Sequence, residues 1–98
     1  MRTGVLFFFS LLLAMTAFAQ KELLYVGTYS VRGSEGIYVL EFDRRAGTLR
    51  QVSTAGGAKS PSFLAFHPLG WYLYAVNEGA EGGAVTAYAI DRKTGTLT

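Results

Sequence analysis

The sequence predicts an all-β fold: a β-propeller segment of about two four-stranded antiparallel blades, preceded by a signal peptide. The main observation is an internal repeat, in which GIYVLEFDRRAGTL, starting at Gly36, aligns with AVTAYAIDRKTGTL, starting 48 residues later at Ala84. In addition, runs rich in β-branched and aromatic residues alternate with turn residues, and none has the 3.6-residue period of a helix. A four-stranded unit that repeats at this spacing is typical of propeller blades.

Residues 1–19 have the pattern of a signal peptide. A basic residue, Arg2, precedes an apolar run over residues 5–15, and Ala17-Phe18-Ala19 forms an A-x-A cleavage pattern. The apolar run is shorter than the roughly 20 residues that a membrane span needs, which disfavours the alternative of a stable membrane anchor. We therefore expect export to the periplasm or the cell exterior, with residues 20–98 as the folded part.

The first blade should contain three strands, at residues 22–29, 36–43 and 48–54. A polar loop at residues 30–35 joins the first two strands. The stretch from Asp43 to Gly47 suits a tight hairpin turn with a left-handed glycine at its end. The innermost strand of a four-stranded blade is therefore missing from this unit.

The second blade should have strands at residues 61–67, 71–77 and 84–91 and the start of a fourth at residue 96. Pro61 opens the first of these strands, a position at which the missing N–H is tolerated. We expect the chain to hold blade 1 and most of blade 2 of a larger propeller. The remaining blades would be needed to close the ring, so the segment alone should be inactive.

Composition excludes several kinds of site. The chain has no cysteine and one histidine, which excludes disulfides, a thiol nucleophile and a histidine-rich metal site within it. Its formal net charge is +2, with the basic residues scattered, which argues against nucleic-acid binding.

Strand alternation predicts which end of the blades carries function. Because successive strands reverse direction, the loops at residues 30–35, 55–60 and 78–83 should share one end of the two blades. The tight turns should share the other end. Long loops on a rigid scaffold are where binding and catalytic residues are usually found, so the candidates are sought on the loop face.

Glu78 is the candidate catalytic residue, because it follows a strand and enters a glycine-rich loop. As a general base it could activate water, and the preceding Asn77 could position substrate hydroxyls. The alternative is a structural carboxylate bonded to backbone N–H groups. Both roles stay open, because a lone carboxylate does not define a catalytic constellation.

Three further residues are candidates for substrate binding. Lys59 and Arg32 could attract an anionic substrate, although they could equally be solvated loop cations. Ser62 opens the innermost strand of the second blade, but it lacks the G-x-S-x-G elbow of a serine nucleophile. His67 precedes a turn at the opposite end, where a structural role is expected.

The strings YVGTYS and SPSFLAFHPLGWYLYAVNEG, together with the paired repeat, resemble the lactonase family of seven-bladed propellers, which includes bacterial 6-phosphogluconolactonases. The resemblance covers residues 23–98. It implies hydrolysis of a sugar lactone without metal or cofactor, with most acid–base and anion-binding residues in later blades.

The predicted leader departs from this pattern, since 6-phosphogluconolactone is a cytoplasmic intermediate. Two functions stay open: an exported lactone hydrolase acting by general-base attack of water, and a non-catalytic exported propeller that binds cell-surface glycan or protein.

Overall fold

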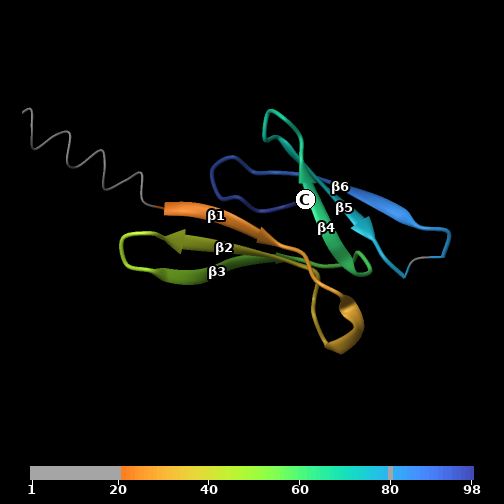
Figure 1. Cartoon of the computed structure of the whole chain (residues 1–98). Coiled ribbons are helices and arrows are strands. Elements are labelled where there is room, and N and C mark those ends of the chain that lie inside the picture. Colours follow the sequence, from red (N-terminus) through yellow and green to blue (C-terminus); the bar gives the residue numbers. More distant parts are fainter. Residues whose placement is uncertain (1–20, 80) are drawn as a thin grey trace, which may run out of the picture.

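The computed structural model describes residues 21–79 and 81–98, which form two three-stranded antiparallel sheets (Figure 1). In each sheet every strand pairs with its neighbour in the chain. The first sheet holds β1 (Lys21–Val26), β2 (Ile37–Asp43) and β3 (Thr48–Ala55), and the second holds β4 (Pro61–Phe66), β5 (Tyr72–Asn77) and β6 (Ala84–Ala89). The predicted signal peptide lies outside the described residues.

The second sheet carries the start of a fourth strand. Ile90 and Leu97 form an antiparallel bridge. Next to it, Ala89 and Thr98 exchange two backbone hydrogen bonds of 2.9 and 3.1 Å. Within residues 21–79 and 81–98, no strand pairs with the free edge of β1. Both features agree with a first blade that lacks its innermost strand and a second blade that is nearly complete.

The two hairpin turns of the repeat have the same geometry. The carbonyl oxygen of Asp43 accepts a hydrogen bond from Gly47 N–H at 2.8 Å, and the equivalent bond from Gly95 to Asp91 is 2.7 Å. In each turn the aspartate Oδ1 accepts hydrogen bonds from the backbone N–H groups two and three residues further on. Both glycines are left-handed, with φ of 69° and 80°, as predicted for Gly47.

The structure differs from the sequence-based expectation between residues 27 and 35. Strand β1 ends at Val26, and Thr28 N–H donates to the Pro61 carbonyl oxygen at 3.0 Å, which joins the end of β1 to β4. A Cβ at Gly27 would lie 2.3 Å from the Pro61 oxygen. The strand therefore stops early because the chain turns toward the second sheet, and only glycine permits the approach.

The loop that follows contains one turn of 3-10 helix, Ser30–Arg32, where no helix was predicted. The left-handed Gly33, with φ of 91°, ends this turn. Among the described residues, the structure contains no apolar helix of the length that a bilayer span requires.

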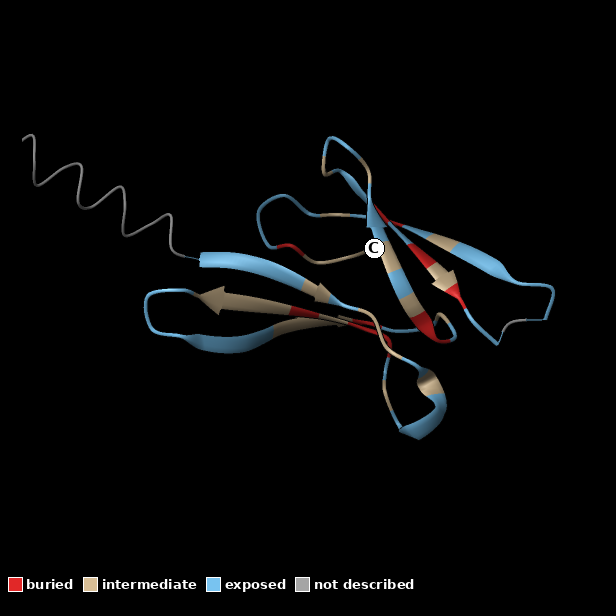
Figure 2. Cartoon of the chain, in the orientation of Figure 1, coloured by how far each residue is buried: buried red, intermediate tan, exposed pale blue. Residues whose placement is uncertain are grey.

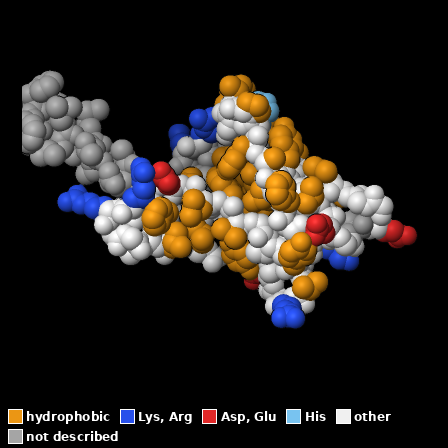
Figure 3. Space-filling view, viewed as in Figure 1, with side chains coloured by type: hydrophobic (Ala, Val, Ile, Leu, Met, Phe, Trp, Pro, Cys, Tyr) orange, Lys and Arg blue, Asp and Glu red, His pale blue; other side chains and the backbone are white. Residues whose placement is uncertain are grey.

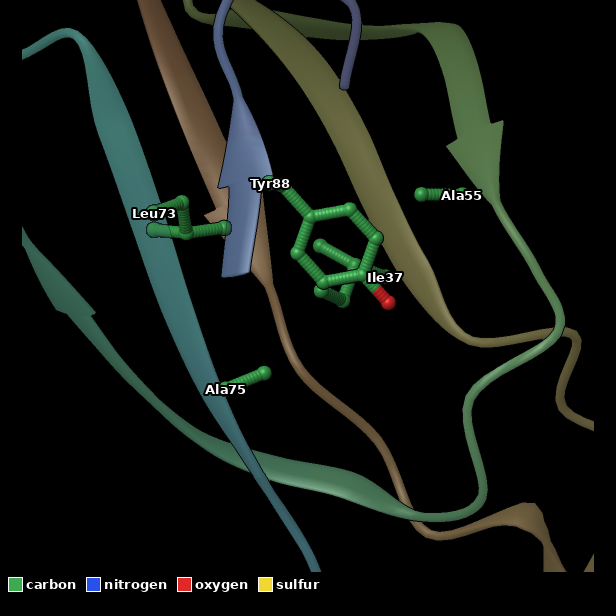
Figure 4. Packing of buried hydrophobic residues seen from close by; sticks show 5 residues of the cluster. All are labelled: Ile37, Ala55, Leu73, Ala75 and Tyr88. Atoms are coloured by element: carbon green, nitrogen blue, oxygen red, sulfur yellow. The ribbon is translucent and has the colours of Figure 1, made fainter. Parts of the chain in front are cut away.

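The core lies where the two sheets meet. Ile37 and Ala55 from the first sheet pack with Leu73, Ala75 and Tyr88 from the second (Figure 4). Alternate residues of β5 are buried, as expected for a strand with one face on the core. Figure 2 shows the buried residues gathered along β2, β4 and β5 near this junction. The two sheets therefore share one small core.

Candidate functional site on the loop face

The three loops predicted to share one end of the blades are joined by hydrogen bonds. Ser30 N–H donates to Ser60 Oγ at 2.9 Å, and Ser60 N–H donates to Ser30 Oγ at 2.8 Å. On its other side, the Ser60 carbonyl oxygen accepts a hydrogen bond from Glu78 N–H at 3.1 Å. Because these bonds link all three loops, the structure has a single loop face, built from both sheets.

Hydrogen bonds fix both ends of the first loop, at residues 30–35. Thr28 Oγ1 donates to the Gly36 carbonyl oxygen at 2.6 Å, and the Thr28 and Ser34 hydroxyls are also hydrogen-bonded. Tyr38 Oη accepts a hydrogen bond from Glu35 N–H at 2.9 Å. The exposed Arg32 therefore projects from a loop whose two ends are fixed.

Asn77 is buried, with 7% of its surface exposed. Its Nδ2 donates to the Lys59 carbonyl oxygen at 3.2 Å, and its Oδ1 accepts a hydrogen bond from the Thr86 hydroxyl at 2.6 Å. The first bond holds the end of β5 against the loop that precedes β4, and the second joins it to β6. Contact between Asn77 and a substrate remains a prediction.

Lys59 and Glu78 are exposed on the loop face. The side chain of Lys59 lies across Gly79, where an added Cβ would be 3.5 Å from Lys59 Cε and 4.0 Å from Nζ. The ammonium group therefore lies beside the residue that follows Glu78. The structure therefore places the Lys59 side chain at the chain segment that carries Glu78, on the face where both were predicted.

Ser62 occupies a β-bulge. Pro61 pairs with Asn77 and Phe63 pairs with Val76, so Ser62 is the extra residue on β4. Its hydroxyl is buried and has no hydrogen-bond partner among the described residues. Bulges are common next to active sites, where they redirect a side chain. A role for Ser62 in substrate binding nevertheless remains a prediction, because its hydroxyl is not accessible in this structure.

His67 lies in the turn at the opposite end of the second sheet. Its Nδ1 accepts a hydrogen bond from Leu69 N–H at 3.2 Å, and its ring packs edge-on against Tyr72 with 5.7 Å between centroids. Arg92 Nη1 donates to the Leu69 carbonyl oxygen at 3.2 Å, so the Arg92 turn lies at the same end. These contacts agree with the structural role predicted for His67.

The ion pairs within 4 Å that join two described residues lie on the first sheet and its β2–β3 turn: Lys21–Glu41, Arg44–Glu22 and Arg50–Glu41. Residues 21–79 and 81–98 contain no group of three or more His, Cys, Asp or Glu side chains that could hold a metal ion. The loop face thus offers exposed carboxylates and cations, among them Glu78 and Lys59, to a ligand.

Sequence reasoning missed the two serines that link the loops. Ser30 and Ser60 are 30 residues apart, and nothing in the sequence indicates that each bonds to the backbone of the other. A serine in a polar loop is too common to single out. The only available signal was the prediction that the two loops share one end.

Comparison with known proteins identifies the fold family. A family model described as lactonase, 7-bladed beta-propeller, matches residues 23–98. The chain belongs to the lactonase family of seven-bladed β-propellers. The two sheets of this lactonase-family chain are therefore propeller blades, and the predicted fold class is confirmed.

Relatives of this lactonase-family chain include proteins named for lactone hydrolysis. A 6-phosphogluconolactonase of Bacillus subtilis is 37% identical over 78 residues, which are 80% of this chain and 22% of the relative. The chain thus spans about a fifth of the length of the curated relatives that it matches.

Solved structures of similar proteins agree with the fold. The periplasmic gluconolactonase of Pseudomonas aeruginosa is 35% identical with a TM-score of 0.70, over 80% of this chain and 23% of that one. A candidate 6-phosphogluconolactonase of Bacteroides fragilis is also 35% identical, with a TM-score of 0.72, over 80% of this chain and 22% of that one.

Proposed function

We propose that this segment is the N-terminal part, blade 1 and most of blade 2, of an exported propeller that hydrolyses a sugar lactone resembling 6-phosphogluconolactone. The observation that carries the proposal is the exposed Lys59 and Glu78 on one loop face of a lactonase-family fold. Relatives named 6-phosphogluconolactonase and gluconolactonase support the substrate class.

The proposed chemistry is general-base attack of water without a metal. Glu78 takes a proton from water while the water oxygen bonds to the lactone carbonyl carbon, which gives a tetrahedral oxyanion. The ring C–O bond then breaks, and the ring oxygen takes the proton and leaves as a hydroxyl group. Lys59 and Arg32 would attract the anionic substrate, and cations from other blades would stabilise the oxyanion.

Export is the second part of the proposal. The leader pattern at residues 1–19 supports it, and so does the likeness to a periplasmic gluconolactonase. The expected mature protein begins at Gln20 and is found in the periplasm or the medium. Mass spectrometry of the N-terminal peptide after cell fractionation tests this directly, and an intact Met1 terminus in the membrane or cytoplasmic fraction would contradict it.

The activity is tested with the complete propeller that carries this segment. Opening of 6-phosphogluconolactone and of unphosphorylated gluconolactone is followed as acid release, each against its spontaneous rate. The proposal expects acceleration of at least one lactone. Spontaneous rates for both, together with binding to a cell-surface glycan or protein, would instead support the non-catalytic propeller.

A further inference from the structure

Ser60 adopts an unusual backbone conformation at the centre of the loop face. Its φ is +43°, and among the described residues it is the only non-glycine residue with a positive φ. It is also buried, with 4% of its surface exposed. A residue keeps such a conformation only where its surroundings enforce it, and these conformations cluster at functional sites.

Hydrogen bonds to neighbouring loops hold Ser60 in this conformation. Its N–H and Oγ are both bonded to Ser30, at 2.8 and 2.9 Å, and its carbonyl oxygen accepts from Glu78 N–H. The preceding residue, Lys59, is held through its own carbonyl oxygen by Asn77. Ser60 therefore connects the first blade's loop to the backbone of the residues that carry both charged groups of the proposed site.

We propose that Ser60, locked by Ser30, is a positioning residue that fixes the Lys59 ammonium over Gly79, the residue after Glu78, to bind an anionic sugar lactone. This inference rests on the proposed function. Ser60 does not touch the substrate; it sets the direction in which the chain leaves the first blade and enters β4. The Lys59 side chain then lies across Gly79, and the phosphate of the lactone is the group that it binds.

The test compares serine variants of the complete propeller. Ser30→Ala removes the hydroxyl that accepts from Ser60 N–H. Ser60→Gly removes the hydroxyl that accepts a hydrogen bond from Ser30 N–H. Because glycine adopts a positive φ without strain, this variant tests the proposal even if Ser30→Ala fails to fold. Ser53→Ala is the matched control, because it deletes a buried hydroxyl with no hydrogen-bond partner among the described residues. Ser30→Thr retains a hydroxyl and serves as the rescue variant.

The readout is the ratio of KM for 6-phosphogluconolactone to KM for unphosphorylated gluconolactone. We expect Ser30→Ala and Ser60→Gly to raise KM for the phosphorylated lactone about tenfold, the scale of one lost hydrogen bond, with a smaller change for the other lactone. Ser53→Ala should leave the ratio unchanged, and Ser30→Thr should restore it. A general loss of structure would instead change the kinetic constants for both lactones alike.

The outcomes separate this inference from the function on which it rests. A wild-type protein that opens neither lactone refutes the proposed function and the inference together. An active protein whose KM ratio stays unchanged in both variants, or which acts only on the unphosphorylated lactone, overturns the inference alone.

Discussion

Tyr25 is half-buried and Tyr88 is buried, and their hydroxyl groups differ in what they contact. Tyr25 Oη donates to the Gly95 carbonyl oxygen at 2.7 Å, which links the first sheet to the last turn. Tyr88 Oη is buried in the core and has no hydrogen-bond partner among the described residues. Burial raises the pKa of both hydroxyls. Removing the hydroxyl should therefore destabilise the protein at Tyr25 but not at Tyr88.

Tyr25→Phe should lower the free energy of unfolding of the complete propeller by about 1 kcal/mol, because it removes a satisfied hydrogen bond. Tyr88→Phe should leave it unchanged or raise it by up to about 1 kcal/mol, because it removes an unpaired buried hydroxyl. Urea unfolding measures both. A larger loss in Tyr88→Phe than in Tyr25→Phe would show that the Tyr88 hydroxyl has a partner in solution.

Gly27→Ala should be destabilising by about 1–3 kcal/mol, the usual range for overpacking. The added methyl group would lie 2.3 Å from a backbone oxygen, that of Pro61, which cannot rotate away. Gly56→Ala is the comparison and should cost less, since its Cβ would lie 3.3 Å from the Glu35 carbonyl oxygen, a milder contact than the one at Gly27. Thermal unfolding compares the two variants; equal melting temperatures would mean that the sheets approach less closely than described.

At the scale of elements, the aspartate-to-glycine turn is the clearest repeated unit. Asp91 accepts backbone hydrogen bonds from Thr94 and Lys93, and these bonds lower the pKa of its carboxyl group below the ordinary value. A lowered pKa in the folded state means that the ionised carboxylate stabilises the turn. That contribution is present above the unfolded pKa of about 3.8 and is lost as pH falls through the folded value.

Acidification should therefore open the turn at Asp91. Amide hydrogen exchange at Gly95, whose N–H donates to the Asp91 carbonyl oxygen, reports this opening after correction for the intrinsic exchange rate. In Asp91→Asn the side-chain oxygen still accepts hydrogen bonds but does not titrate. The protection of the Gly95 amide from exchange should therefore not fall when the pH is lowered. An identical acid response in both proteins would place the titrating group elsewhere.

Elements with local signals could be predicted from the sequence. The strand runs and the Asp43-to-Gly47 turn depend on residues close in the chain, and they agree with the structure to within a few residues. The early end of β1 could not be predicted, because it depends on how closely Gly27 approaches the second sheet. Likewise, the hydrogen bonds of Asn77 and Ser60 are set by the register between loops that are distant in sequence.

At the scale of the molecule, much apolar surface is uncovered. Figure 3 shows hydrophobic side chains spread over both sheets, with the charged side chains mostly at the margins. On the second sheet, Phe63 is 71% exposed and Val85 69%. Phe63 pairs with Val76 and Val76 with Val85, so the three residues form a row across the sheet. In a seven-bladed fold the next blade would cover such a face.

Residues 20–98 produced alone should aggregate, because these faces and the free edge of β1 remain uncovered. Light scattering and denaturant unfolding of the isolated segment, with the complete propeller as control, measure this. A soluble monomer that unfolds cooperatively and opens lactones would contradict the expectation that later blades are needed.

The central claim is that the loop face of this segment forms part of a lactone-opening site, and kcat of Glu78→Gln in the complete propeller tests it most directly. Loss of the general base should lower kcat by about 100-fold or more, whereas Glu81→Gln, an exposed carboxylate of the same loop, should leave it unchanged. Full activity in Glu78→Gln would remove this residue from the mechanism and contradict the account.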